Sequence, residues 1–289
     1  MPSTNSPLRY PGGKSQLNIY ISHILDINNL RHATYCEPFC GGAGVAITLL
    51  LKNKVDEIFL NDYDPAVYSV WYAILNQPEK FIDKIIHTPI TLKEWYIQHE
   101  IYSTLKDTSG FCFDLAWSTF FLNRTNRSGI IGGGPIGGFN QTARDKIDCR
   151  FNKNTLINKI KKISDFNKKI HLYNNDGIEF IRKILIPRQQ PMFIFFDPPY
   201  YSQGQNLYKN ALQENYHVEL ANIIQQLNQH YWIVTYDNVN KIKQLYKNCD
   251  GWKYGIRYSA NKKRKESELI YKSPITRLES YERVFLEKI

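Results

Sequence analysis

Residues 192–201 read MFIFFDPPYY, and this stretch decides the fold class. Its unbroken apolar run predicts a strand that is buried on both faces. Asp197 ends the run, and because Pro198 and Pro199 cannot donate ladder hydrogen bonds, the strand must stop there with backbone carbonyls left free. Buried strands of this kind are typical of an open α/β sheet, in which ligands gather at the carboxyl ends of the strands.

Other short apolar runs end in the same way, at Gly, Asp, Asn or Pro, and helix-period segments lie between several of them. This alternation predicts a doubly wound α/β sheet. A basic loop within residues 253–273 joins two further strand-like stretches, which indicates an antiparallel end to the sheet. The other runs are ATYCEPFCGG (33–42), EIFLNDYDP (57–65), IHLYNNDG (170–177) and YWIVTYDN (231–238).

The middle of the chain does not follow this alternation of strands and helices. It holds helical stretches, the glycine-rich segment NRTNRSGIIGGGPIGGFN (123–140) and a lysine-rich helix candidate. Glycine at this density excludes a regular helix and favours a hairpin or an extended loop. We therefore predict a separately packed inserted domain over residues 86–167, between the two parts of a catalytic domain at 1–85 and 168–289.

Composition and charge narrow the class of protein. The chain has 289 residues, a formal net charge of +10 and a pI near 9.2, which favours a polyanionic partner such as nucleic acid. No apolar run approaches the ~20 residues that span a bilayer, and no secretory leader is evident, so we expect a cytoplasmic protein with no membrane partner. The cysteines show no metal-ligand spacing, so we expect no metal.

Residues 37–44, EPFCGGAG, follow a predicted strand and open a predicted helix. Glycines there permit a tight turn and a close approach of a ligand to the backbone. Asp62 ends the next strand, where a Rossmann-like fold places the acid that holds ribose hydroxyls. Alternatively, the glycines only form a turn and Asp62 only caps a helix, but their joint spacing favours a nucleoside-bearing cofactor.

The corner after residue 196 suits an exocyclic amine on a planar base. The Asp197 carboxylate and the Pro198 carbonyl could accept the two hydrogens of such an amine and stabilise the positive charge that grows during its attack. Tyr200 could stack on the base, a contact worth roughly 1–3 kcal/mol. The competing interpretation is a strand end followed by an exposed tyrosine.

The segment SPLRYPGGKSQL (6–17) ends like a phosphate-binding loop. Such a loop needs a glycine six residues before its lysine, because backbone N–H groups must wrap the phosphates. Leu8 stands at that position, so a nucleotide triphosphatase is a weak alternative.

The motifs together point to a known family. RYPGGKSQL (9–17), EPFCGGAG (37–44), LNDYDP (60–65), FLNRTNRSG (121–129), DPPY (197–200) and ESELIY (266–271) follow one another in the chain. With this set the sequence resembles the Dam-type (D12 class, alpha group) DNA adenine N6-methyltransferases. The resemblance implies a Rossmann-like, seven-stranded class I S-adenosylmethionine-dependent methyltransferase sheet with an inserted, mainly helical DNA-recognition domain that contains a hairpin.

The resemblance also implies an activity. S-adenosylmethionine would methylate N6 of an adenine that is flipped out of double-stranded DNA, leaving S-adenosylhomocysteine and needing no metal. The catalytic residues would be Asp197, Pro198, Pro199 and Tyr200. The cofactor-binding residues would be Tyr10, Lys14, Glu37, Phe39, Gly41, Asp62, Asp176 and Asp197. Where many members carry glycine this chain has Ala43, so the turn after Gly41 departs from the family pattern.

The DNA-binding residues that the resemblance implies lie at the amino terminus and in the insert. They are Arg9, Arg124, Asn126, Arg127 and Ser128. An alternative for Arg124, and for Asn123 beside it, is an internal tie that orients the hairpin. The run from Lys262 to Lys265 could clamp the DNA backbone or form a solvated loop.

Other functions stay open at this stage. Methylation of cytosine N4 uses a similar amine, although serine more often opens the corresponding motif there. A catalytically silent DNA-binding protein on the same scaffold is a further alternative. We expect a bacterial or phage-encoded, nucleoid-associated protein, with a cognate restriction endonuclease as a second candidate partner.

Overall fold

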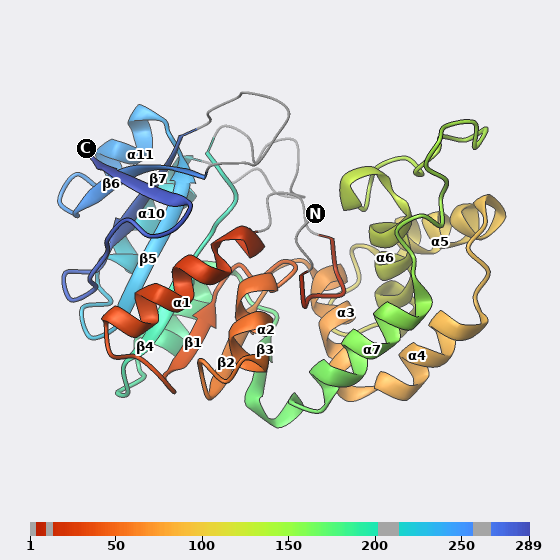
Figure 1. Ribbon diagram of the computed structural model, residues 1–289, viewed down its shortest axis with the longest axis horizontal. Helices are drawn as coiled ribbons and strands as arrows, with labels where there is room; N and C mark the ends of the chain where they lie inside the picture. The colour runs from red at the N-terminus through yellow and green to blue at the C-terminus, as the bar shows by residue number, and fades with distance from the viewer. Residues whose placement is uncertain (1–3, 10–13, 202–213, 257–266) are drawn as a thin grey trace.

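A computed structural model describes residues 4–9, 14–201, 214–256 and 267–289. A β-sheet with its covering helices forms one side of the molecule, and a body of helices forms the other (Figure 1). Tyr10 and the run from Lys262 to Lys265 lie outside the described residues, so their predicted roles stay predictions.

Within the described residues the sheet has eight strands, in the order β3-β2-β1-β4-β5-β7-β6-β8. The first five are parallel, and β7, β6 and β8 add antiparallel pairs. The predicted α/β class is confirmed, with one strand more than the predicted seven because β8 is a largely exposed edge strand with a weak apolar signal. The strands are β1 (Thr34–Glu37), β2 (Glu57–Asn61), β3 (Ile170–Tyr173), β4 (Met192–Phe196), β5 (Tyr231–Asp237), β6 (Gly251–Ile256), β7 (Glu268–Lys272) and β8 (Val284–Lys288).

The central strand β4 explains why its sequence is apolar throughout. Phe193 and Phe195 point into one hydrophobic core, whereas Met192, Ile194 and Phe196 point into the other. Successive side chains of a strand face opposite sides, so a strand covered on both faces needs an apolar residue at every position. Full burial of each such side chain contributes roughly 1.5–3 kcal/mol.

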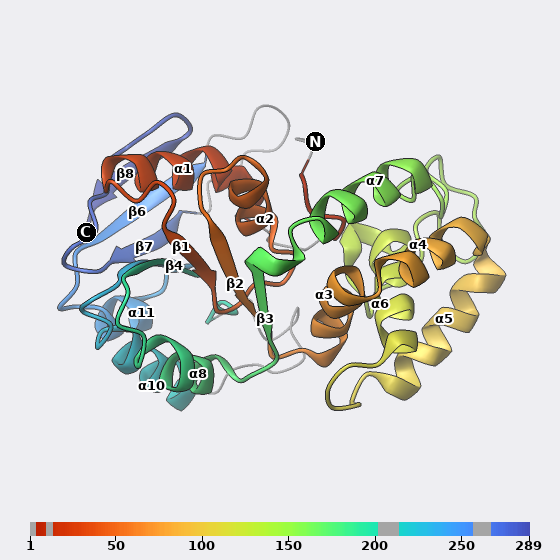
Figure 2. The same cartoon turned by 90° about the horizontal axis from the view of Figure 1, so that it is seen from below.

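Helices cover both faces of the sheet (Figure 2). On one face lie the helices α1 (Asn18–Ile27), after the short 3₁₀ turn Lys14–Leu17, and α2 (Gly44–Leu51). On the other face lie α8 (Gly177–Phe180), which continues as the π-helical turn Ile181–Leu185, α10 (Glu214–Ile224) and α11 (Asn240–Leu245). This layering confirms the doubly wound arrangement.

The helical body consists of α3 (Pro65–Asn76), α4 (Pro78–His87), α5 (Leu92–Leu105), α6 (Phe113–Thr125) and α7 (Lys153–Ser164). Helix α6 is buried on nearly all sides because it packs against both α3 and α5, while α4 packs against α7. Helix α3 and nearly all of α4 precede residue 86 in the chain, yet both pack within this body. None of the helices in the described part of the chain is long and apolar enough to cross a membrane.

The glycine-rich segment of the insert forms an extended loop, one of the two predicted forms, with little strand pairing. Between α6 and α7, which the structure describes in full, there are one isolated antiparallel bridge, Asn126 to Pro135, the 3₁₀ turn Arg127–Gly129, and otherwise turns and irregular chain. Gly129, Gly137 and Gly138 have φ of 78°, 86° and 74°, which no regular strand accommodates. The antiparallel pairing stays limited to one bridge because these glycines form successive turns, and Pro135 has no N–H for a ladder.

Candidate active site

The order of the strands brings the predicted acids to one edge of the sheet. The chain turns from β1 outward through β2 to β3 and then returns to β4 on the other side of β1. This reversal between β1 and β4 is a topological switch point, where open α/β sheets bind their ligands. Along this edge, at the carboxyl ends of the strands, stand Glu37, Asp62, Asp176 and Asp197.

Asp62 is tied to the turn after β1. Its Oδ2 accepts a hydrogen bond from the Gly41 N–H at 2.8 Å, and its Oδ1 accepts one from the Asp64 N–H at 3.0 Å. Burial raises the pKa of Asp62 to about 7, and the Asp64 charge adds to the rise. Each carboxylate oxygen has a second lone pair, so the group fits a ligand that donates hydroxyl hydrogens, such as a ribose.

The turn itself contains a strained alanine. Gly41 has φ 45° and Ala43 has φ 44°, so both are in the left-handed region that favours glycine. Ala43 is the position at which the sequence departs from the family pattern. The turn therefore forms in spite of the departure, at an expected strain of about 1–2 kcal/mol.

Glu37 connects β1 to the first turn of α2. Its Oε1 accepts hydrogen bonds from the Tyr35 hydroxyl and the Ala46 N–H, both at 3.0 Å. Burial raises the pKa of Glu37 to about 8. These bonds give Glu37 a structural task, since Ala46 lies in the first turn of a helix and its N–H has no partner within that helix. Its contact with the cofactor stays a prediction.

Asp176 lies at the start of α8. Its Oδ1 accepts from the backbone N–H groups of Ile178 at 2.9 Å and Glu179 at 3.3 Å, and its Oδ2 accepts from the Tyr216 hydroxyl at 2.9 Å. Tyr216, on α10, is a residue that sequence reasoning missed, because no motif marks it.

The Phe39 ring closes the space beside this acid. A Cβ built at Gly177 would lie 2.5 Å from the Phe39 Cζ, so a larger residue there would displace the ring. An apolar ring beside an acid with hydrogen-bonding neighbours fits one end of a nucleoside.

Asp197 follows β4, as predicted, and is held through one oxygen. Its Oδ1 accepts from the Thr235 hydroxyl at 2.7 Å and lies 3.5 Å from Lys14 Nζ. The described residues make no hydrogen bond or ion pair to Oδ2, which leaves that oxygen to accept a donor. Burial raises the pKa of Asp197, and Lys14 opposes that rise. Thr235, on β5, was not predicted to take part.

Lys14 joins this corner from the amino-terminal segment. Its Nζ donates to the Tyr200 hydroxyl and lies 4.7 Å from the centre of the Tyr200 ring. It also lies 3.4 Å from Glu268 Oε1 on β7. The sequence analysis names the stretch around Glu268 without giving that residue a role.

The Asn126 side chain is bonded inside the protein, and its predicted contact with DNA stays a prediction. Asn126 is buried, its Oδ1 accepts from the Trp95 Nε1 at 2.6 Å, and its Nδ2 donates to the carbonyls of Ile130 at 3.0 Å and Ile131 at 2.8 Å. Both hydrogens of the amide are therefore donated within the protein, and its oxygen accepts from an indole. Asn126 therefore shapes the loop that follows α6.

Arg124 also turns inward. Its guanidinium donates to the backbone carbonyls of Pro7, at 3.5 Å, and Arg150. Burial lowers the pKa of Arg124 to about 10. These contacts favour the internal tie over a base contact. Arg127 and Ser128, in the turn that follows, are exposed, so their predicted contacts with DNA stay predictions.

Residues 4–9 form an amino-terminal strap between the sheet and the helical body (Figure 1). At its end the Arg9 N–H donates to Asn123 Oδ1 at 2.8 Å, and Asn123 Nδ2 donates to the Arg9 carbonyl at 2.7 Å. A Cβ at Gly129 would lie 2.2 Å from the Arg9 carbonyl oxygen, so the loop touches the strap backbone. Arg9 Nη1 donates to the Asn126 carbonyl at 3.1 Å, and contact of Arg9 with DNA stays a prediction.

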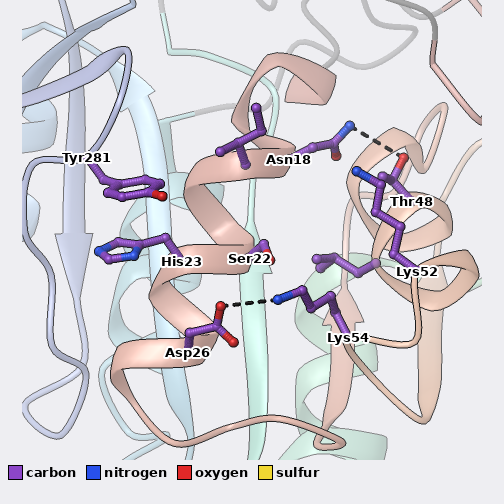
Figure 3. A pocket seen from close by; sticks show the side chains of 10 residues that line it. Asn18, Ser22, His23, Asp26, Thr48, Lys52, Lys54 and Tyr281 are labelled. Carbon is purple, nitrogen blue, oxygen red and sulfur yellow. Dashed lines mark hydrogen bonds and ion pairs between the residues drawn. The ribbon is translucent and has the colours of Figure 1, made fainter.

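A separate cavity of about 280 Å³ lies between α1 and α2 (Figure 3). Its wall includes His23, which stacks on Tyr281, and the ion pair of Lys54 with Asp26. None of the predicted site residues lines it. Within the described ranges, no group of His, Cys, Asp and Glu side chains is arranged to hold a metal ion.

The sheet, the glycine turn and the acidic switch point define the class of protein, a class I methyltransferase scaffold. Residues 10–265 match the family model of the D12 class N6 adenine-specific DNA methyltransferases, and the chain belongs to this family. The resemblance stated from the motifs is confirmed. The protein is thus an adenine DNA methyltransferase, with S-adenosylmethionine as its methyl donor.

Individual relatives are distant. The type II methyltransferase M.MjaIII of Methanocaldococcus jannaschii is 24% identical over 208 residues, which cover 67% of this chain and 68% of that protein. The rRNA methyltransferase aviRa of Streptomyces viridochromogenes covers 92% of this chain and 87% of its own, with 10% identity and a TM-score of 0.40. The match to TrmK of M. capricolum, solved with S-adenosylhomocysteine, covers 86% of this chain and 66% of TrmK, with 10% identity and a TM-score of 0.30.

Proposed function

We propose that the protein methylates N6 of an adenine that it flips out of double-stranded DNA at a specific sequence. The single observation that carries this proposal is the Asp197 carboxylate, which is anchored through Oδ1 and receives no hydrogen bond or ion pair at Oδ2 from the described residues. An N6 amino group is a poor nucleophile because its lone pair is delocalised into the ring. A fixed acceptor on one of its hydrogens stabilises the positive charge that develops on nitrogen during attack.

The remaining groups of the corner position the base. The Pro198 carbonyl is the second acceptor that we propose for the amino group. Lys14 donates to the Tyr200 hydroxyl and so holds the ring on which the flipped base would stack. Catalysis would then come from positioning and electrostatics, without a covalent enzyme intermediate.

The methyl donor would lie along the switch point. When bound, S-adenosylmethionine supplies an electrophilic methyl group on a sulfonium centre. Asp62 would accept from its ribose hydroxyls, Phe39 and Asp176 would flank its base, and Gly41, Glu37 and Lys14 would complete the pocket. Tyr10 is proposed for the same pocket on the sequence resemblance alone.

DNA would bind across the helical body. We propose residues 86–167, together with the helices α3 and α4 that pack on them, as the recognition domain. Arg127 and Ser128 are exposed in the turn after α6 and would face the DNA, while Arg9 would reach it from the strap. Flipping an adenine costs a few kcal/mol, which phosphate contacts from this basic chain would offset.

The experiment is to express the protein in cells whose DNA lacks methylated adenine, digest the DNA to nucleosides and identify the modified base. N6-methyladenine is expected, and single-molecule sequencing of the same DNA would give the sequence context. N4-methylcytosine would establish the cytosine alternative. No modified base from a folded protein that binds DNA would establish the catalytically silent alternative.

The biological setting is also a proposal. A type II methyltransferase among the relatives supports a restriction-modification role with a cognate endonuclease, in the cytoplasm of a bacterial or phage-infected cell. Cutting of unmethylated host DNA by the product of a neighbouring gene, and protection by this enzyme, would test it.

A further inference from the structure

We infer that Glu268 is a positioning residue for methyl transfer, because it holds the Lys14 ammonium away from the Asp197 carboxylate. This inference rests on the proposed function of the corner. It assigns a role to an antiparallel strand, β7, that lies two places from β4 in the sheet.

The geometry of Lys14 is the first step. Its side chain is 9% exposed, and its Nζ lies 3.5 Å from Asp197 Oδ1 and 3.4 Å from Glu268 Oε1. A charge-assisted hydrogen bond between an ammonium and a single carboxylate is about 2.7–2.9 Å long. Lys14 is therefore shared between two carboxylates and makes a short bond to neither.

The charge balance is the second step. Burial alone would lower the pKa of Lys14, but Asp197 and Glu268 together raise it, so the ammonium stays protonated. Two carboxylates and one ammonium leave one negative charge in the corner. Without Glu268, Lys14 and Asp197 would neutralise each other as a close pair, and the acceptor for the amino group would be lost. A net negative corner suits a nitrogen that becomes positive during attack.

The rigidity of Glu268 is the third step. Its Oε2 accepts from the Tyr254 hydroxyl on β6, and its backbone pairs with Asp237 of β5 and Tyr254 of β6 in the sheet. The strand start is tied further by Asn238, whose Nδ2 donates to the Ser267 hydroxyl at 2.8 Å. A carboxylate fixed in this way can set the place of a lysine, since both ends of the contact are held.

The test compares Glu268→Gln with Glu287→Gln, which changes an exposed glutamate on β8 of the same sheet. The rate of single-turnover methyl transfer, at saturating DNA and methyl donor, should fall about 10²-fold in Glu268→Gln. A displacement of about 1 Å in the position of a group in the active site can lower the rate by that much. Binding of S-adenosylhomocysteine by calorimetry and binding of DNA should change less than about 3-fold. A rate within about 3-fold of the unmodified enzyme would overturn the inference.

A second comparison separates positioning from a structural role. If Glu268 acts through Lys14, the double variant Lys14→Met/Glu268→Gln should be no slower than Lys14→Met alone. Losses that multiply would show that Glu268 acts independently, which overturns the inference. Should Glu268→Gln fail to fold, Tyr254→Phe is the second variant, because it removes the hydroxyl that donates to Glu268 Oε2 and keeps the charge of Glu268. Methyl transfer by Tyr254→Phe should be several-fold slower, with an unchanged melting temperature. An unchanged rate would overturn the inference.

Failure of the proposed function and failure of the inference about Glu268 give different results. An unmodified enzyme that produces no N6-methyladenine contradicts the function itself. An unmodified enzyme that produces it, beside a Glu268→Gln variant with the same rate, contradicts only the role of Glu268.

Discussion

The catalytic corner of the sheet and the loop after α6 use the same kinds of side chain for opposite tasks. In the corner, Asp197 follows a buried strand, and the part of the chain that the structure describes leaves one of its carboxylate oxygens unbonded. In the loop, Asn126 is buried, both hydrogens of its amide are donated to backbone carbonyls, and its oxygen accepts from the Trp95 indole. The difference teaches that a polar residue in a functional motif acts on a ligand only where its own fold leaves an atom unsatisfied.

Loss of Asp197 should give the largest effect and mark the corner as catalytic. Asp197→Ala removes the acceptor of the amino group, so methyl transfer should fall about 10³-fold. The affinity for duplex DNA should stay within a few-fold, because the loop after α6 is untouched. Single-turnover assays and fluorescence anisotropy measure the two quantities, and exposed Asp165→Ala is the matched control. Near-normal transfer by Asp197→Ala would place the chemistry elsewhere.

The rate of transfer should also depend on pH through the same carboxylate. Burial raises the pKa of Asp197, and only the ionised form accepts the amino hydrogen, so activity should be full above that pKa and fall as the pH drops through it. Below the pKa the loss approaches tenfold per pH unit. Rates measured from about pH 5 to 9, with circular dichroism to confirm folding, check this. A flat profile in a folded enzyme contradicts it.

Gly129 tests how closely the loop depends on the strap. Gly129→Ala would place a Cβ 2.2 Å from the Arg9 carbonyl oxygen at a residue whose φ is 78°, so backbone must move. We expect a loss of about 2–3 kcal/mol in the free energy of unfolding, measured with urea. Gly132→Ala in the same loop is the control, since a Cβ there meets nothing within 4 Å. Equal stability of the two variants would mean that the contact is not rigid.

Arg127 and Asn126 are neighbours with opposite expectations. Arg127→Ala should weaken DNA binding about tenfold and lower the salt slope of binding by about 1, with little change in stability. Asn126→Ala should lower the free energy of unfolding by about 2 kcal/mol, because the Trp95 indole N–H and the Ile131 carbonyl each lose the bond to Asn126, while the Ile130 carbonyl keeps the one from the Gly133 N–H. Urea unfolding measures the stability of both variants, and binding titrations at several salt concentrations measure their affinity for DNA. Lost stability in Arg127→Ala and lost DNA affinity in Asn126→Ala would mean that the two roles are exchanged.

Ala43 gives the smallest expected effect. Ala43→Gly relieves a left-handed φ of 44° but removes a buried methyl group, and the two terms of about 1 kcal/mol each largely offset. The free energy of unfolding should therefore rise by less than about 1 kcal/mol, with methyl transfer unchanged. A clear loss of stability in thermal unfolding would show that the methyl contact outweighs the strain.

The corner was largely predictable because its signals are local. An apolar run followed by Asp197 and two prolines fixes both a strand and its end, and parallel strands bring their carboxyl ends to one edge. Thr235 and Glu268 could not be found in this way, since they reach Asp197 and Lys14 from strands distant in sequence. The loop was less predictable because contacts with Trp95 and the strap, not local pattern, decide which way Asn126 and Arg124 point.

The long sequence separations of these contacts set the order in which the enzyme matures. Asn123 is 114 residues from Arg9, and Glu268 is 254 residues from Lys14. Synthesis proceeds at about 5–20 residues per second, so a nascent chain waits roughly 10–50 s between making Lys14 and making its partner on β7. Contacts this distant also form late in folding. A growing polypeptide therefore carries the glycine turn and the insert long before its methylating corner is complete, and an incomplete chain leaves DNA unmodified.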